Sequence, residues 1–357
     1  MSTLTTVATT SETSAGSVTT ATTSRRGFLG LIGTTALLAG CGTGTTTGDG
    51  PGKAQVTKLK YQGNAGSVAL PELAADLGYL GTVTLDWVGN TTSGPQDIQS
   101  ATTGQTHFGS AFNGAVVKLF AAGAPITAVI GSYGVDAKSY DGYYTLSDSP
   151  LATAADLYGR KVGMNTLGAH FEAVLDTFLQ RNGADRKKVE PIVVAPINID
   201  EALRQRQIDV GVLSGILRDE AVAGGGIKAL FTDYQLLGSF TAGTYVFRND
   251  FIKQNPDTMR AFTSGVAKAI EWARTTPQPE VIDRMTKIVA ARGRSEPTTS
   301  LKYFKSFGIA GTGGVIAEKE ISTWISWLED QGQVKKGKVT ASSVYTNQYN
   351  SFAKGGS

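Results

Sequence analysis

Short apolar runs and amphipathic stretches alternate along residues 56–250 of the chain. Runs such as 83–88 (VTLDWV) and 126–131 (ITAVIG) have the length and composition of buried strands, and turn residues bound them. Between these runs, Leu70, Leu73 and Leu77 recur at the spacing of one helix face. This alternation predicts βαβ units and mostly parallel sheets, and therefore an α/β fold.

Expected strands and helices alternate in both halves of this stretch. Strands are expected at 56–61, 83–88, 106–110, 126–131, 161–164, 189–194, 209–213, 229–231 and 244–248. Helices are expected at 68–77, 93–104, 114–122, 156–158, 171–181, 200–207, 256–274, 278–291 and 318–330. The second of these helices has the clearest ends, because Ser93 suits an N-cap and Gly104 suits a helix stop.

A different pattern precedes this folded body. Arg25 and Arg26 stand before an apolar run at 28–39 that ends close to Cys41, the single cysteine of the chain. The run is shorter than the roughly 20 residues that a membrane-spanning helix needs. The segment resembles a twin-arginine export signal followed by the lipobox of bacterial lipoproteins. This resemblance implies a signal peptide at 1–40, a lipid on Cys41 and, after it, a flexible tether at 41–55; the alternative is a plain apolar leader with a chance cysteine.

Composition excludes several classes of function. The 33 Lys and Arg nearly balance the 30 Asp and Glu, and no block of like charge occurs, so a nucleic-acid partner is not expected. Two histidines and one cysteine leave no Cys/His spacing typical of a metal site. No hydrolase, Walker or dinucleotide motif occurs in a suitable context. We therefore expect no metal, no cofactor and no enzymatic activity. Separately, the chain is expected to be a monomer.

Five stretches carry a resemblance to a known family. They are LAADLGYL at 73–80, the segment from Gly94 to Gly109, SPLATAADLYGRKV at 149–162, DEAL to IDVGV at 200–212, and NPD to WAR at 255–274. In this order they resemble the nitrate/sulfonate/taurine-type solute-binding proteins of ABC importers, over about residues 57–290.

The resemblance implies a two-lobed periplasmic-binding-protein fold of type II. Each lobe would be a mostly parallel sheet flanked by helices, with a ligand cleft between the lobes. Lobe 1 would comprise 56–143 and 245–350, and lobe 2 would comprise 144–244. The chain crossings that act as hinges are expected near 142–145 and 243–245, where glycines occur.

Strand-to-helix turns are the candidate ligand sites. Ligands bind beyond the carboxyl ends of parallel strands, where helix N-termini present free N–H groups that suit anions. The candidate ligand residues are Gln62, Asn64, Ser67, Thr92, Ser93, Phe112, Asn113, Tyr133, Asn165, Thr166, His170, Ser214, Phe240 and Thr241. Several have a structural alternative: the serines and His170 could cap helices, Asn113 could hold a turn, and the aromatic residues could belong to the core.

These observations predict the extracytoplasmic solute-binding component of an ABC importer. It would capture a small organic anion or zwitterion, similar to a sulfonate, taurine or nitrate, and deliver it to the transmembrane subunits of a permease. The candidate turns of the first lobe contain no Lys or Arg, so N–H and hydroxyl dipoles would have to hold an anion. The alternatives are an exported enzyme or a ligand sensor built on the same fold, including one for thiamine-precursor-type ligands.

Overall fold

A computed structural model describes residues 54–353 of the chain. The predictions for Arg25, Arg26 and Cys41, the signal peptide at 1–40 and the tether up to residue 53 lie outside the described residues. Within 54–353, no helix combines the length and apolarity needed to cross a bilayer.

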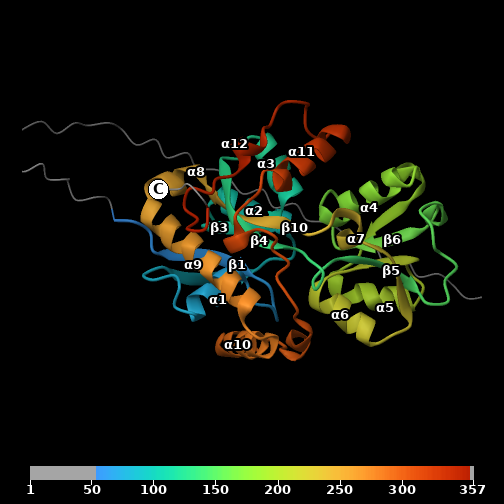
Figure 1. Cartoon of the computed structure of the whole chain (residues 1–357), viewed down its shortest axis with the longest axis horizontal. Coiled ribbons are helices and arrows are strands. Elements are labelled where there is room, and N and C mark those ends of the chain that lie inside the picture. The colour runs from blue at the N-terminus through green and yellow to red at the C-terminus, as the bar shows by residue number, and fades with distance from the viewer. Residues whose placement is uncertain (1–53, 354–357) are drawn as a thin grey trace, which may run out of the picture. The chain divides into compact units, whose positions relative to one another are not determined.

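The first group of strands is β1, β2, β3, β4 and β10, and we call the part built on it the first lobe (Figure 1). Strands β1 and β2 pair in parallel, and β10 lies between β3 and β4, antiparallel to both. Strand β1 lies beside β3, because the His107 backbone N–H just before β3 donates to the Lys60 carbonyl at 2.9 Å. The bounds are β1 Lys58–Gly63, β2 Thr84–Asn90, β3 Phe108–Phe112, β4 Ile126–Val135 and β10 Phe240–Arg248.

The second lobe is built on a five-stranded sheet in the order β7-β6-β8-β5-β9. Strand β6 pairs in parallel with β7 and β8, whereas β5 runs antiparallel to β8 and β9. Each lobe therefore holds one antiparallel strand among parallel ones. The bounds are β5 Gly142–Leu146, β6 Lys161–Met164, β7 Glu190–Val193, β8 Val210–Leu213 and β9 Ile227–Thr232.

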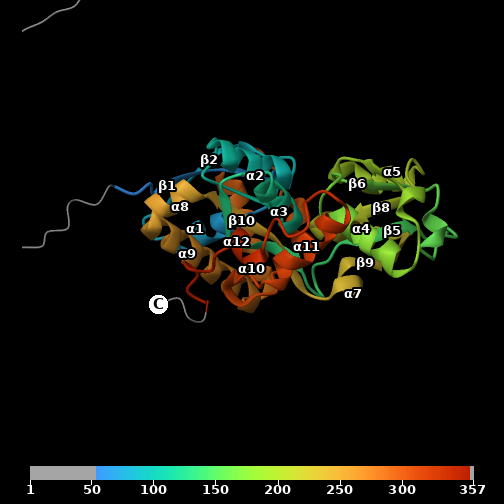
Figure 2. The same cartoon turned by 90° about the horizontal axis from the view of Figure 1, so that it is seen from above.

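Helices cover both groups of strands (Figures 1 and 2). In the first lobe these are α1 Leu70–Asp76, α2 Gly94–Thr103, α3 Asn113–Ala121, α8 Asn249–Gln254, α9 Pro256–Thr275, α10 Gln278–Ala291, α11 Lys319–Asp330 and α12 Ala341–Val344. In the second lobe they are α4 His170–Arg181, α5 Ile199–Arg204, α6 Gly215–Ala223 and α7 Asp233–Leu237. The largest apolar core joins α1 and α9 to the first-lobe strands, and a second joins α3 to α11. The helices after residue 249 thus complete the first lobe.

The two antiparallel strands explain where the chain crosses between lobes. The crossings run through 136–141, between β4 and β5, and through 233–239, between β9 and β10. The expected hinges at 142–145 and 243–245 are wrong, because both segments are inside strands with partners on two sides. The lobe boundaries that we expected lie a few residues after the crossings.

Most predicted elements are confirmed, with shifted ends. Strand Lys161–Met164 and helix Gln278–Ala291 have the predicted bounds, and α2 is capped by Ser93 and Gly104. Four helices were not predicted, α6, α7, α8 and α12, and neither was strand β5. Helix α7 nevertheless carries a readable signal, a capping box between Thr232 and Gln235.

Candidate functional site

One pocket collects the strand and helix ends that the fold favours for ligand binding. It has a volume of about 360 Å³ and is lined by residues of both lobes; we call it the cleft pocket. Gly94 begins α2, His170 begins α4 and Gly215 begins α6, and all three line it. The first turn of a helix leaves backbone N–H groups without intrahelical partners, so these ends suit an anionic group.

Six predicted ligand residues line the cleft pocket. Four of them follow strands or begin helices, as the sequence argument expected, whereas Phe112 is the last residue of β3 and Tyr133 lies inside β4. They are Phe112, Tyr133, Asn165, Thr166, His170 and Ser214. Phe171 and Phe307 add aromatic wall, and Ser139 and Ser306 add hydroxyl groups.

The turn at 62–67 contributes no residue to this pocket, although Gln62, Asn64 and Ser67 were predicted there. The Gly66 N–H donates to Glu296 Oε2 at 2.8 Å, and Arg292 donates to the Ser67 carbonyl at 2.7 Å. A segment more than 200 residues later in the chain therefore pairs with the Gly66 N–H and the Ser67 carbonyl, while Gln62 Oε1 is buried without a partner among the described residues.

Thr92 and Ser93 also have partners within their own turn. The Thr92 hydroxyl donates to Gln96 Oε1 at 2.8 Å, and the Ser93 hydroxyl accepts from the Gln96 N–H as the N-cap of α2. The capping alternative for Ser93 thus describes its observed contacts, and the adjacent Gly94 lines the pocket instead.

Asn113, Phe240 and Thr241 are buried beside the pocket and do not line it. The Asn113 amide donates to the Thr241 carbonyl at 2.9 Å and to the Glu320 carbonyl at 3.1 Å. Asn113 therefore joins α3 to β10 and α11, and its contacts are those of a structural residue.

His170 lies between two carboxylates that we did not predict as site residues. Its Nε2 is 3.1 Å from Asp141 Oδ2 and 3.1 Å from Asp233 Oδ2. His170 is 5% exposed and Asp233 is fully buried, whereas Asp141 is partly exposed. We call these three residues the Asp-His-Asp cluster.

The cluster shifts the protonation of its members. Burial disfavours the imidazolium, but hydrogen bonds and charge from Asp141 and Asp233 outweigh it and raise the pKa of His170 to about 9. Burial, together with the charge of Asp141, raises the pKa of Asp233 to about 6 although His170 opposes the shift. No spacing in the sequence could indicate this cluster, since Asp141 precedes β5, His170 begins α4 and Asp233 begins α7.

The charged residues that line the cleft pocket are Asp141 and His170 alone within the described chain, with no Lys or Arg. A sulfonate or nitrate would therefore meet helix ends and hydroxyls, together with the Asp141 carboxyl group and the His170 ring. The pocket has room for a small organic molecule, and its aromatic walls suit an apolar body.

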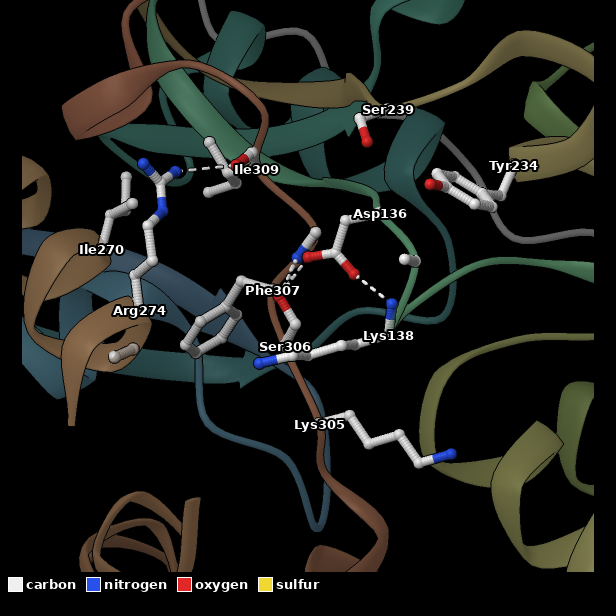
Figure 3. Close-up of a pocket in the computed structure, with 13 residues that line it drawn as sticks. Asp136, Lys138, Tyr234, Ser239, Ile270, Arg274, Lys305, Ser306, Phe307 and Ile309 are labelled. Carbon is white, nitrogen blue, oxygen red and sulfur yellow. Dashed lines mark hydrogen bonds between the residues drawn. The ribbon is translucent and has the colours of Figure 1, made fainter. Parts of the chain in front are cut away.

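A second pocket, of about 320 Å³, shares Ser306 and Phe307 with the cleft pocket. Figure 3 shows its lining residues, with Asp136 directed toward Ser306, whose hydroxyl donates to it at 2.7 Å. Lys138 and Lys305 line it as well, and Lys305 reaches Asp219 of α6 at 2.9 Å. It contains no first residue of a helix, so we take the cleft pocket as the candidate site.

The strand orders and the cleft pocket define the two-lobed fold of periplasmic binding proteins, and solved structures share it. The alkanesulfonate-binding protein SsuA from Xanthomonas axonopodis pv. citri, bound to MOPS, is 17% identical and covers 82% of this chain and 99% of its own, with a TM-score of 0.65. The nitrate-binding protein NrtA from Synechocystis PCC 6803 is 16% identical, with coverages of 82% and 87% and a TM-score of 0.64. The desulfurization enzyme DSZB is 16% identical, with coverages of 82% and 97% and a TM-score of 0.57.

The family follows from the sequence itself. The model of the family described as NMT1/THI5 like matches residues 73–280, which is more than half of the chain. The chain belongs to this family. No curated protein sequence matches it.

Proposed function

We propose that the protein is the solute-binding component of an ABC importer and takes up a small organic anion or zwitterion in the cleft pocket. The observation that carries this proposal is the meeting of three helix N-termini, from α2, α4 and α6, at one pocket lined by both lobes. Structural similarity to sulfonate- and nitrate-binding proteins supports it. The two lobes would be joined by the crossings at 136–141 and 233–239.

Solute binding is tested with the purified full chain. Alkanesulfonates, taurine, nitrate, aromatic acids and thiamine precursors are screened by thermal shift, and hits are measured by calorimetry. A solute at 100 times its Kd should stabilise the folded chain by about 2.7 kcal/mol. A screen in which none of these compounds shifts the transition would contradict the proposed ligand class.

Two variants decide which pocket is used. Asn165→Ala removes an amide that lines only the cleft pocket, and Lys138→Ala removes a cation that lines only the second pocket. We expect weaker binding in the first variant and unchanged binding in the second. The reverse result would move the site to the second pocket.

Catalysis is the alternative that the fold similarity to DSZB keeps open. A binding protein returns its solute unchanged, whereas an enzyme consumes it. Mass spectrometry of the solute after long incubation with the protein separates the two, and loss of solute would favour the enzyme.

Export and anchoring form part of the proposal. The protein would leave the cell by the twin-arginine route and be held by a lipid on Cys41 at the outer face of the cytoplasmic membrane, as a monomer. We expect Cys41→Ala to appear in the soluble fraction of cells, and Arg25→Lys with Arg26→Lys to remain in the cytoplasm. A membrane-bound Cys41→Ala chain would rule out the lipid anchor.

A further inference from the structure

The Asp-His-Asp cluster has the composition and spacing of a metal site. We propose that Asp141, His170 and Asp233 bind one divalent cation of the zinc type, with an open coordination position toward the cleft pocket. Zinc accepts imidazole nitrogen and carboxylate oxygen, and sites that also bind a small molecule use three protein ligands and leave a fourth position open.

The distances fit a tetrahedral ion. Ligand atoms held at 2.0–2.1 Å around zinc lie about 3.3 Å apart. His170 Nε2 lies 3.1 Å from Asp141 Oδ2 and 3.1 Å from Asp233 Oδ2. All three ligand atoms lie within 4.8 Å of one another. The two distances from His170 would widen by only a few tenths of an ångström around the ion, and the two carboxylate oxygens would come to about 3.3 Å from each other.

The ligands are held in place by their own neighbours. Asp233 Oδ1 accepts from the Asp141 backbone N–H at 2.9 Å, which leaves Oδ2 for the ion. The Asp233 N–H donates to the Asp141 carbonyl at 3.0 Å, so the two ligands cannot separate easily. The His170 ring packs against Phe112 and Phe240, at centroid distances of 5.1 and 5.7 Å. These contacts hold the carboxylates and the ring in place, while His170 Nδ1 has no hydrogen-bond partner among the described residues.

The charges of the three ligands suit a divalent cation. Two carboxylate groups lie against His170, and no Lys or Arg lines the pocket within residues 54–353. A divalent cation with neutral His170 brings the sum to zero. Asp233 is fully buried and does not line the cleft pocket, whereas Asp141 and His170 do.

The position of the cluster links the ion to the solute, and this step rests on the proposed function. Asp141 and His170 both line the cleft pocket, so the open position of the ion would face the bound molecule. The cation would supply a positive charge for the anionic group of the solute, because no Lys or Arg of residues 54–353 lines this pocket.

Metal binding is measured on the untagged full chain after removal of metals with a chelator. Calorimetry and competition with a chromophoric chelator should give one Zn²⁺ per chain. His170→Ala and Asp233→Asn should each weaken binding by about 100-fold, because loss of a supporting residue alone costs 10–100-fold. His107→Ala is the matched control, because His107 is the other histidine of the chain and its Nδ1 accepts from the Lys60 N–H. Absence of a Zn²⁺ isotherm, or equal binding by His170→Ala, would overturn the proposal.

A second measurement needs no variant. With two histidines in the chain, nitrogen-15 spectra of the imidazole groups can be assigned, and Zn²⁺ should move the signals of His170 and leave those of His107. Unchanged His170 signals would overturn the proposal. The solute screen is then repeated with and without Zn²⁺. If the chain binds Zn²⁺ but none of the solutes, the metal site is supported and the proposed function is contradicted. If the chain binds a solute but no Zn²⁺, the proposed function is supported and the metal site is overturned.

Discussion

Asp97 is a buried carboxylate whose removal should stabilise the protein at neutral pH. It lies in the first turn of α2, whose N-terminus lines the cleft pocket, and it is 7% exposed. Its Oδ2 accepts from the Ser110 N–H at 2.7 Å, while its buried Oδ1 has no partner among the described residues. Burial raises its pKa to about 7, and the Ser110 hydrogen bond lowers it only in part.

The sign of the effect follows from this shift. The folded chain holds the proton on Asp97 up to about pH 7, whereas the unfolded chain releases it near the model-compound pKa of 3.8. The folded state therefore binds more protons between these values, and the free energy of unfolding falls as the pH rises through them. The pKa of Asp97 rises from 3.8 to about 7, and each tenfold change in proton affinity corresponds to 1.36 kcal/mol. The free energy of unfolding is therefore lowered by at most about 4 kcal/mol, a limit reached above pH 7.

Asp97→Asn removes the charge and keeps an oxygen to accept from the Ser110 N–H. Urea unfolding of the full chain should show Asp97→Asn more stable than the parent at pH 8, by up to about 4 kcal/mol. The difference should shrink toward zero near pH 4. Asp148→Asn, at an exposed acid paired with Arg206, is the control for a general charge effect. The reasoning fails if Asp97→Asn is destabilised at pH 8, or if its advantage is the same at both pH values.

Two further predictions concern residues that position the pocket. Asn113→Ala leaves the Thr241 and Glu320 carbonyls without their buried donor, so it should lower the free energy of unfolding by about 2–4 kcal/mol and leave solute affinity unchanged in calorimetry. A large loss of affinity in a folded Asn113→Ala chain would instead make Asn113 a ligand residue. Gly134→Ala would place a Cβ against the Gly308 carbonyl and should cost about 1–3 kcal/mol in urea unfolding, and an unchanged midpoint would contradict that contact.

The sequence alone predicted the bounds of elements whose ends are marked by capping residues. Ser93 and Gly104 bound α2 as predicted, because a cap and a left-handed glycine act within one turn. Strand β5, residues 142–146 (GYYTL), was taken for a hinge, because nothing in five residues shows that β8 and β9 pair with both of its edges. Antiparallel insertion of a strand between two others is a property of the whole sheet.

The candidate site, too, could be predicted only in part from the sequence. Strand-to-helix turns indicated the pocket, since the carboxyl ends of parallel strands meet at one edge of a sheet. The turn at 62–67 has the same local chemistry, yet Arg292 and Glu296 occupy its polar groups. Asp141 and Asp233 were missed because each is an ordinary acid next to a strand, and only the two crossings bring them to His170.

The position of the crossings changes what a hinge variant can test. Asp141 and Asp233 end the first crossing and begin the second, and two hydrogen bonds tie them together. Rotation of one lobe against the other would therefore bend the chain at 136–140 and, after helix α7, at 238–239. Gly243 is inside β10, paired with Phe112 on one side and Tyr133 on the other. Since proline in a central strand removes a ladder hydrogen bond, Gly243→Pro would disrupt the first-lobe sheet and report on strand pairing instead of hinge motion.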